Sequence, residues 1–134
     1  MRRRPWIPAL IDVVLIVAFA AIGMSSHEES ISALTLATVA WPFLAGGAIG
    51  WLVSLAWRNP AAPLRTGVPV WIFAAGGGMI LRVATGGGFA VPFLVVTLIV
   101  LAVLLIGWRA LAALVAWRRS HRVSSRSERP VDAR

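Results

Sequence analysis

The residues best suited to chemistry in this chain are charged side chains that interrupt long apolar segments. Asp12 lies inside the first apolar segment, and Arg109 lies inside the last. On insertion scales, Asp or Arg at the centre of a membrane helix costs about 2.5–3.5 kcal/mol, and less near the helix ends. At a rise of ~1.5 Å per residue, both positions fall about 10 Å inside the same membrane boundary, because their helices run in opposite directions. The sequence therefore predicts an Asp12–Arg109 ion pair.

This predicted pair has two interpretations. In the functional one, Asp12 is a proton or cation site inside the membrane. In the structural one, the pair links the first and last helices and has no chemistry of its own. The structural interpretation is the simpler one, because two opposite charges at one depth neutralise each other's cost.

A second polar group is expected at the opposite end of the molecule. His27, Glu28 and Glu29 follow the first apolar segment, and Arg82 lies near the end of the third. Arg82 needs a partner or a route to water, and the two glutamates are the acids that the sequence places on that side. We predict a shallow polar vestibule that admits an ion or a small solute. The alternative is a set of solvated residues at helix ends, with exposed pairs worth about 0–1 kcal/mol.

The composition excludes a water-soluble globule. Apolar residues make up 59% of the 134 residues and charged residues only 13%, where a soluble domain has about 25%. The formal charge is +8, and all thirteen basic residues are arginine. The absence of cysteine excludes disulfides, thiolate metal sites and cysteine catalysis. No zinc, phosphate-loop or nucleophile motif is present, so we expect no cofactor, no metal site and no catalytic residue.

Four segments are long enough to cross a bilayer, which needs about 20 apolar helical residues. They cover about residues 6–24, 31–57, 67–84 and 89–117. Continuous apolar runs indicate helices, since barrel strands would show about ten residues of alternation. We predict an all-α membrane protein, with a four-transmembrane-helix bundle over residues 1–117. The Ser/Arg-rich tail, residues 118–134, is predicted to be disordered. A cleaved signal peptide is the alternative for the first segment, but its apolar stretch exceeds the usual h-region of about 7–15 residues and contains Asp12.

The arginines predict the orientation. Eleven of them lie in the N-terminal segment, the second loop and the tail, and none lies in the first loop (25–30) or the third (85–88). The positive-inside rule then places both termini in the cytoplasm of a cell-membrane protein. Trp57 and Trp108 fall near that boundary, as an aromatic belt would. The arginine-rich ends are expected to contact anionic lipids rather than nucleic acid, because no aromatic residue follows Trp117 to stack on a base.

Short similarities indicate a tandem repeat of two helical hairpins. The stretch 40–44 resembles 90–94, and Trp57-Arg58 resembles Trp108-Arg109 at offsets of about 50 residues. Chance similarity between Ala- and Gly-rich helices is the alternative. Gly46 and Gly50 also form a Gly-x-x-x-Gly pattern, which favours close helix packing. We expect that packing within one copy rather than between two.

Several stretches together carry a family resemblance. They are Asp12-Val13-Val14-Leu15, the stretch 19–23 followed by His27, the stretch 41–46, Gly78-Met79 with Arg82, and Gly107-Trp108-Arg109. Over roughly residues 5 to 117 the chain resembles the prokaryotic membrane family catalogued as domain of unknown function 3054. The resemblance implies a small four-pass membrane protein and carries over no catalytic or ligand residue. Where similar proteins often have Arg after the glycine of the first helix, this chain has Met24.

These observations favour a small transport or channel-like membrane protein, or a component of one, acting as a homo-oligomer. The alternative is a structural or regulatory membrane subunit without transport activity. An enzyme is the least favoured class, because one intramembrane acid and one histidine make a thin catalytic set. A water-filled cavity that reaches Asp12 would favour transport, and a dry core with Asp12 fully paired would favour the structural class.

Overall fold

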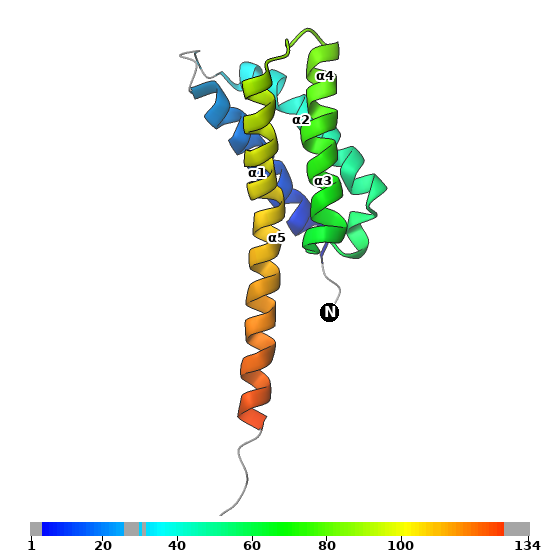
Figure 1. The fold of residues 1–134 in the computed structure, drawn as a ribbon, viewed down its shortest axis with the longest axis vertical. Helices are drawn as coiled ribbons and strands as arrows, with labels where there is room; N and C mark the ends of the chain where they lie inside the picture. Colours follow the sequence, from blue (N-terminus) through cyan, green and yellow to red (C-terminus); the bar gives the residue numbers. More distant parts are fainter. Residues whose placement is uncertain (1–3, 26–29, 31, 128–134) are drawn as a thin grey trace, which may run out of the picture.

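The computed structural model describes residues 4–25, 30 and 32–127. Its helical elements are α1 (Trp6–Ser25), α2 (Ala33–Val53), η1 (Ala56–Arg58), η2 (Pro63–Gly67), α3 (Val68–Ile72), η3 (Phe73–Gly77), α4 (Gly78–Ala84) and α5 (Val91–Ser127) (Figure 1). The run from η2 to α4 forms one continuous third span, Pro63–Ala84. Within the described residues no strand occurs. The predicted all-α architecture with four long apolar helices is confirmed.

The four spans form a ring around a shared core. α2 packs along α1 and along the third span, and α5 packs against the same two neighbours. The loop from α4 to α5 lies at the same end as the end of α1, and α5 projects past the bundle at the other end (Figure 1). α1 begins at the end from which α5 projects. After four passes the chain is therefore back at the end of the bundle where α1 begins.

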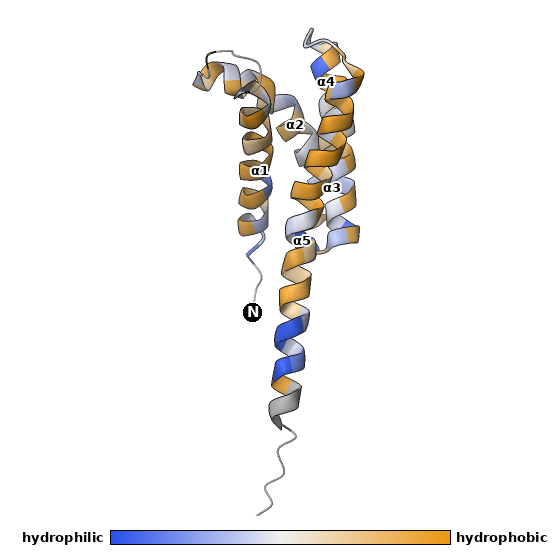
Figure 2. Cartoon of the chain, turned by 60° about the vertical axis from the view of Figure 1, so that its left-hand side comes forward, coloured by the Kyte–Doolittle hydropathy of each residue, from blue (hydrophilic) through white to orange (hydrophobic). Residues whose placement is uncertain are grey.

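The outer surface of the bundle is apolar. Val14, Ile99 and Val103 are 56%, 59% and 66% exposed, and most of the length of the spans is hydrophobic (Figure 2). Water would not tolerate so much contiguous apolar surface, whereas acyl chains do. Polar residues return on the part of α5 that projects from the bundle (Figure 2). This is the surface of a multi-pass membrane protein.

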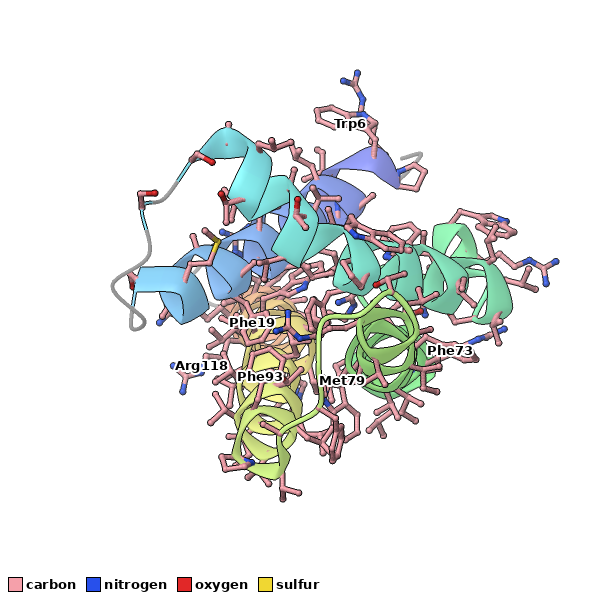
Figure 3. The ribbon with its side chains drawn as sticks, turned by 90° about the horizontal axis from the view of Figure 1, so that it is seen from above. Trp6, Phe19, Phe73, Met79, Phe93 and Arg118 are labelled. Atoms are coloured by element: carbon pink, nitrogen blue, oxygen red, sulfur yellow. The ribbon has the colours of Figure 1, made fainter. Side chains whose placement is uncertain are left out.

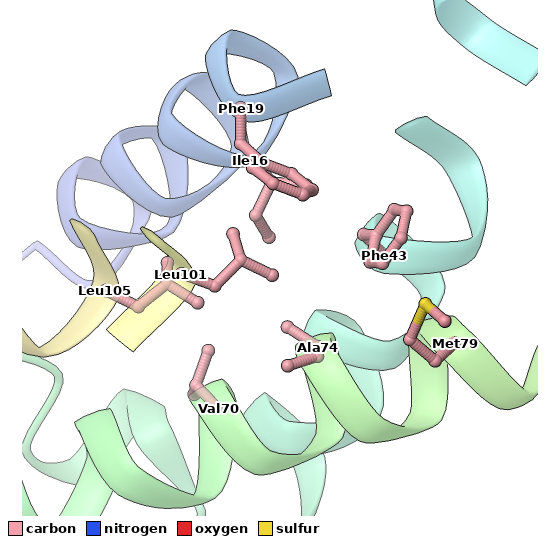
Figure 4. Packing of buried hydrophobic residues seen from close by; sticks show 9 residues of the cluster. Ile16, Phe19, Phe43, Val70, Ala74, Met79, Leu101 and Leu105 are labelled. Carbon is pink, nitrogen blue, oxygen red and sulfur yellow. The ribbon is translucent and has the colours of Figure 1, made fainter. Parts of the chain in front are cut away.

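The centre of the bundle is filled with side chains. Phe43, Leu101 and Leu105 are fully buried and meet Ile16 from α1 and Val70 from the third span (Figure 4). Interiors packed in this way leave no continuous channel for solute. The core of the described bundle is therefore packed with side chains between its two ends.

Glycines set the closest helix contact. A Cβ on Gly46 would collide with the backbone carbonyl oxygen of Phe73, and one on Gly50 would lie 2.7 Å from the Cα of Val70. Small residues let two membrane helices approach to backbone contact. The Gly-x-x-x-Gly pattern therefore packs α2 against the third span of the same chain.

The end of α5 differs from the expectation. The tail from residue 118 was predicted to be disordered, yet α5 continues to Ser127. Arginine is a good helix former, and extending an existing helix is far easier than starting one. The hydroxyl of Ser120 donates to the carbonyl of Trp117, whose ring lies 4.5 Å from that of His121. Hydropathy locates the end of the apolar segment near Trp117, but the helix continues beyond it to Ser127. Residues 128–134 lie outside the described part.

The second and third spans also differ from their predicted bounds. α2 ends at Val53 rather than at 57, and Leu55 turns the chain with a left-handed φ of 50°. The third span begins at Pro63, four residues early, because proline fits the first turn of a helix. Trp57-Arg58 thus lies beyond α2, whereas Trp108-Arg109 lies inside α5. These two pairs are not structurally equivalent, and the hairpin repeat stays a prediction.

Candidate functional site

The structure joins Asp12 of α1 to Arg109 of α5. Nη2 of Arg109 lies 2.6 Å from Oδ2 of Asp12, and Nη1 lies 2.8 Å from Oδ1. The arginine side chain is completely buried and the aspartate side chain is 4% exposed. Two parallel N–H···O bonds of this kind form the strongest geometry available to an arginine–carboxylate pair.

Both charged groups form further hydrogen bonds. The indole nitrogens of Trp51 and Trp108 donate to the two oxygens of Asp12 at 2.8 and 2.9 Å. Nε of Arg109 donates to the carbonyl of Pro60 at 2.9 Å, and Nη1 also donates to the carbonyl of Leu105 at 2.7 Å. The carboxylate therefore accepts four N–H bonds. Loss of one partner would leave an uncompensated buried charge, which is strongly destabilising.

Sequence reasoning missed the residues that surround the pair. Trp108 was assigned to the membrane interface, but its indole N–H is directed to Asp12, and its ring lies 4.6 Å from the guanidinium carbon of Arg109. Gly67 leaves the space that Arg109 fills, since a Cβ there would lie 3.1 Å from Cδ of the arginine. The available signal was the indole N–H itself, which needs an acceptor when it is buried.

A groove along the seam between α1 and α2 reaches Asp12. It has a volume of about 430 Å³ and is lined otherwise by apolar side chains such as Val13, Leu44 and Leu52, and by Trp51. Trp51 already donates its N–H to the carboxylate. The groove is suited to acyl chains rather than to water, and Asp12 has no free oxygen to offer a proton or a cation. This site acts as a cross-link between the first and last helices.

Arg82 of α4 lies toward the other end of the bundle. Its guanidinium carbon lies 4.8 Å from the ring centre of Phe93 on α5. Its Nε is buried and has no hydrogen-bond partner. The loop lies directly over this side chain, because Gly87, whose N–H donates to the Arg82 carbonyl, has no Cβ to collide with it. The neighbouring Gly86 and Gly88 adopt positive φ values, which the turn requires.

Two adjacent cavities meet at Arg82. Their volumes are about 170 and 540 Å³, and both are lined by Phe19, Gly23, Arg82 and Phe93. Figure 3 looks onto this end of the bundle and shows Phe19 and Phe93 close together, beside the loop that joins α4 to α5. The larger cavity falls within the range of about 300–1,000 Å³ typical of ligand pockets. We call the two cavities together the Arg82 vestibule.

The other members of the predicted polar cluster are not placed. His27, Glu28 and Glu29 lie outside the described residues. Within the part of the chain that the structure describes, Asp12 with Arg109 is the ion pair, and no carboxylate pairs with Arg82. Of the predicted polar sites, the structure thus gives the contacts of the Asp12–Arg109 pair and of Arg82.

The protein is a small multi-pass membrane protein of the helical-bundle type. It has four apolar spans, a buried ion pair between the first and the last of them, and the Arg82 vestibule at one end. The chain belongs to the family described as protein of unknown function (DUF3054), whose family model matches residues 9–112. The resemblance noted from the sequence is confirmed. No curated protein and no solved structure matches the chain.

Proposed function

We propose that this protein is a small transport or channel-like membrane protein, or a component of one, in which a solute enters through the Arg82 vestibule. One observation carries the proposal: the buried Nε of Arg82 has no hydrogen-bond partner. An unsatisfied buried N–H is costly, and the same guanidinium group lines two open cavities, so we infer that a ligand binds this side chain there. The guanidinium favours an anion.

The aromatic residues at the inner end of the vestibule support a closed resting state. Phe43 lies behind Phe19 and Phe93, with ring centres 5.5 and 6.3 Å away. Below these rings lies the filled core, and below the core lies the Asp12–Arg109 pair. Passage therefore requires a helix movement or a route between copies of a homo-oligomer, which we propose as the assembled form.

Anion flux tests the proposal. Purified protein is placed in liposomes made permeable to K⁺ with valinomycin, so that anion entry limits swelling in potassium nitrate or chloride. We expect swelling faster than in protein-free liposomes. Arg82→Gln is expected to slow it roughly tenfold, because a charged cavity raises the local anion concentration.

Arg65→Gln is the matched control, since Arg65 is an exposed arginine at the other end of the third span. It is expected to leave the swelling rate unchanged. Swelling no faster than in protein-free liposomes for both salts contradicts the transport proposal and leaves the alternative below.

The alternative is a structural or regulatory membrane subunit without transport activity. The specific observation in its favour is that Asp12 accepts four N–H bonds and that the groove beside it is otherwise apolar. A carboxylate that already accepts four N–H bonds has no acceptor position left for a cation. Under this alternative the vestibule is a binding site with no passage beyond it.

We further propose that the protein lies in a prokaryotic plasma membrane with both termini in the cytoplasm. The supporting pattern is the arginine asymmetry between the two sets of loops and ends. The projecting part of α5, which carries Arg118, Arg119 and Arg122, would then lie among anionic head groups on the cytoplasmic face.

The cysteine-free chain makes this topology directly testable. Ser30→Cys and Ser120→Cys each introduce a single thiol at an exposed position, one on each side of the membrane. A membrane-impermeant maleimide is expected to label Ser30→Cys in intact spheroplasts and Ser120→Cys only after permeabilisation. The reverse pattern would overturn the proposed orientation.

A further inference from the structure

We propose that the Arg82 vestibule binds a singly charged amphiphilic oxyanion, with its head on Arg82 and its apolar chain along α5. The inference deepens the proposed function and rests on the same vestibule. It concerns binding, which is measured separately from passage. The source of such a ligand is either an anionic lipid or a free amphiphile, and both share this chemistry.

The head group is assigned by the arginine. Nε of Arg82 is buried and unpartnered beneath the loop at Gly87, and the guanidinium carbon lies 4.8 Å from the ring centre of Phe93. The terminal nitrogens of the guanidinium are therefore the donors that a ligand can reach. A carboxylate or a phosphate diester can accept two N–H bonds from a guanidinium at once, which is the paired geometry that a guanidinium favours.

The charge of the ligand follows from the lining. Among the described residues that line the two cavities, Arg82 is the only charged side chain. One guanidinium neutralises one negative charge, and a second would remain uncompensated in an apolar site. A monoanion therefore matches the charge of the described lining.

The apolar part is assigned by the shape of the larger cavity. It extends from Arg82 to Phe89 and Val96, which are 58% and 52% exposed on the outer surface of the bundle. The cavity therefore opens sideways, toward the surface that faces acyl chains. Each methylene of an alkyl chain favours burial against these side chains, which adds to the attraction that any anion has for Arg82.

Decanoate is the test ligand, measured by native mass spectrometry of the purified full-length protein in a neutral detergent. We expect retained decanoate and a dissociation constant at least about tenfold higher for Arg82→Gln, the loss expected when a buried charge-assisted bond is removed. Arg65→Gln is expected to bind as the unmodified protein does. Val96→Trp fills the apolar part of the cavity from its outer side and is expected to weaken decanoate without touching Arg82.

Two comparison ligands separate the contributions of head and chain. Acetate has the head without the chain, and decyltrimethylammonium has the chain with the opposite charge. Both are expected to bind much more weakly than decanoate. Equal binding of acetate, equal binding of the cation, or unchanged decanoate binding by Arg82→Gln would overturn the inference.

The source is resolved by competition with lipid vesicles. If phosphatidylglycerol displaces decanoate and phosphatidylcholine does not, the ligand is an anionic lipid. If neither displaces it, the ligand is a free amphiphile; both results support the oxyanion site. Decanoate binding without anion flux supports this inference and contradicts the transport proposal. Arg82-dependent anion flux without decanoate binding supports the transport proposal and contradicts this inference.

Discussion

Arg109→Met is expected to destabilise the protein by about 3–5 kcal/mol, because it leaves a buried carboxylate without its counter-charge. Methionine replaces the apolar part of the side chain, so the loss reports the charge and its bonds rather than a cavity. Asp12 would keep the two indole donors, which cannot neutralise it. The free energy of unfolding is measured by titration with dodecyl sulfate in mixed micelles, with Arg65→Met as the matched control.

A double-mutant cycle identifies the partner. Asp12→Asn alone is expected to be destabilising, and the double variant with Arg109→Met is expected to lose less than the two single losses combined. Exchanging the charges, Asp12→Arg with Arg109→Asp, should recover only part of the stability. The Trp51 and Trp108 donors would then face a cation, and the Pro60 carbonyl would lose its donor. Simple additivity in the cycle would mean that the two residues do not act as a pair.

Gly46→Ala is expected to destabilise the fold at the upper end of the range of about 1–3 kcal/mol for overpacking. The added methyl would meet the carbonyl oxygen of Phe73, and backbone cannot move aside as a flexible side chain can. The same dodecyl sulfate titration measures the effect.

Gly107→Ala is the matched control, because a Cβ at Gly107 in α5 meets no atom within 4 Å. It is expected to be neutral or to stabilise by up to about 1 kcal/mol, since alanine favours helix more than glycine does. Equal effects of the two substitutions would contradict the intramolecular packing role of Gly46. A change of oligomeric state in Gly46→Ala with unchanged unfolding would assign the glycine to an interface between copies.

The sequence by itself determined the number of spans and the relative depth of their charges. Runs of about 20 apolar residues predict membrane helices whatever their neighbours are. Depth follows from counting residues along a helix, because the rise per residue is constant. Asp12 and Arg109 could therefore be matched across 97 positions, and the structure places them in contact. The Gly46 and Gly50 pattern likewise indicated helix packing, because glycine has no side chain and lets two helix backbones come into contact.

Tertiary structure alone decided which way each helix faces and what it meets. Rotation about a helix axis depends on all the packing contacts together, so no local pattern assigned Trp51 to Asp12 or the Pro60 carbonyl to Arg109. The vestibule depends on the same long-range packing. The sequence singled out Arg82 by its charge and its position near the end of an apolar segment. Its contact with Phe93, its unpartnered Nε and the adjoining cavities depend on how α1, α4 and α5 come together. Charge and hydropathy specify how deep a residue lies in a membrane, and side-chain packing specifies its partners.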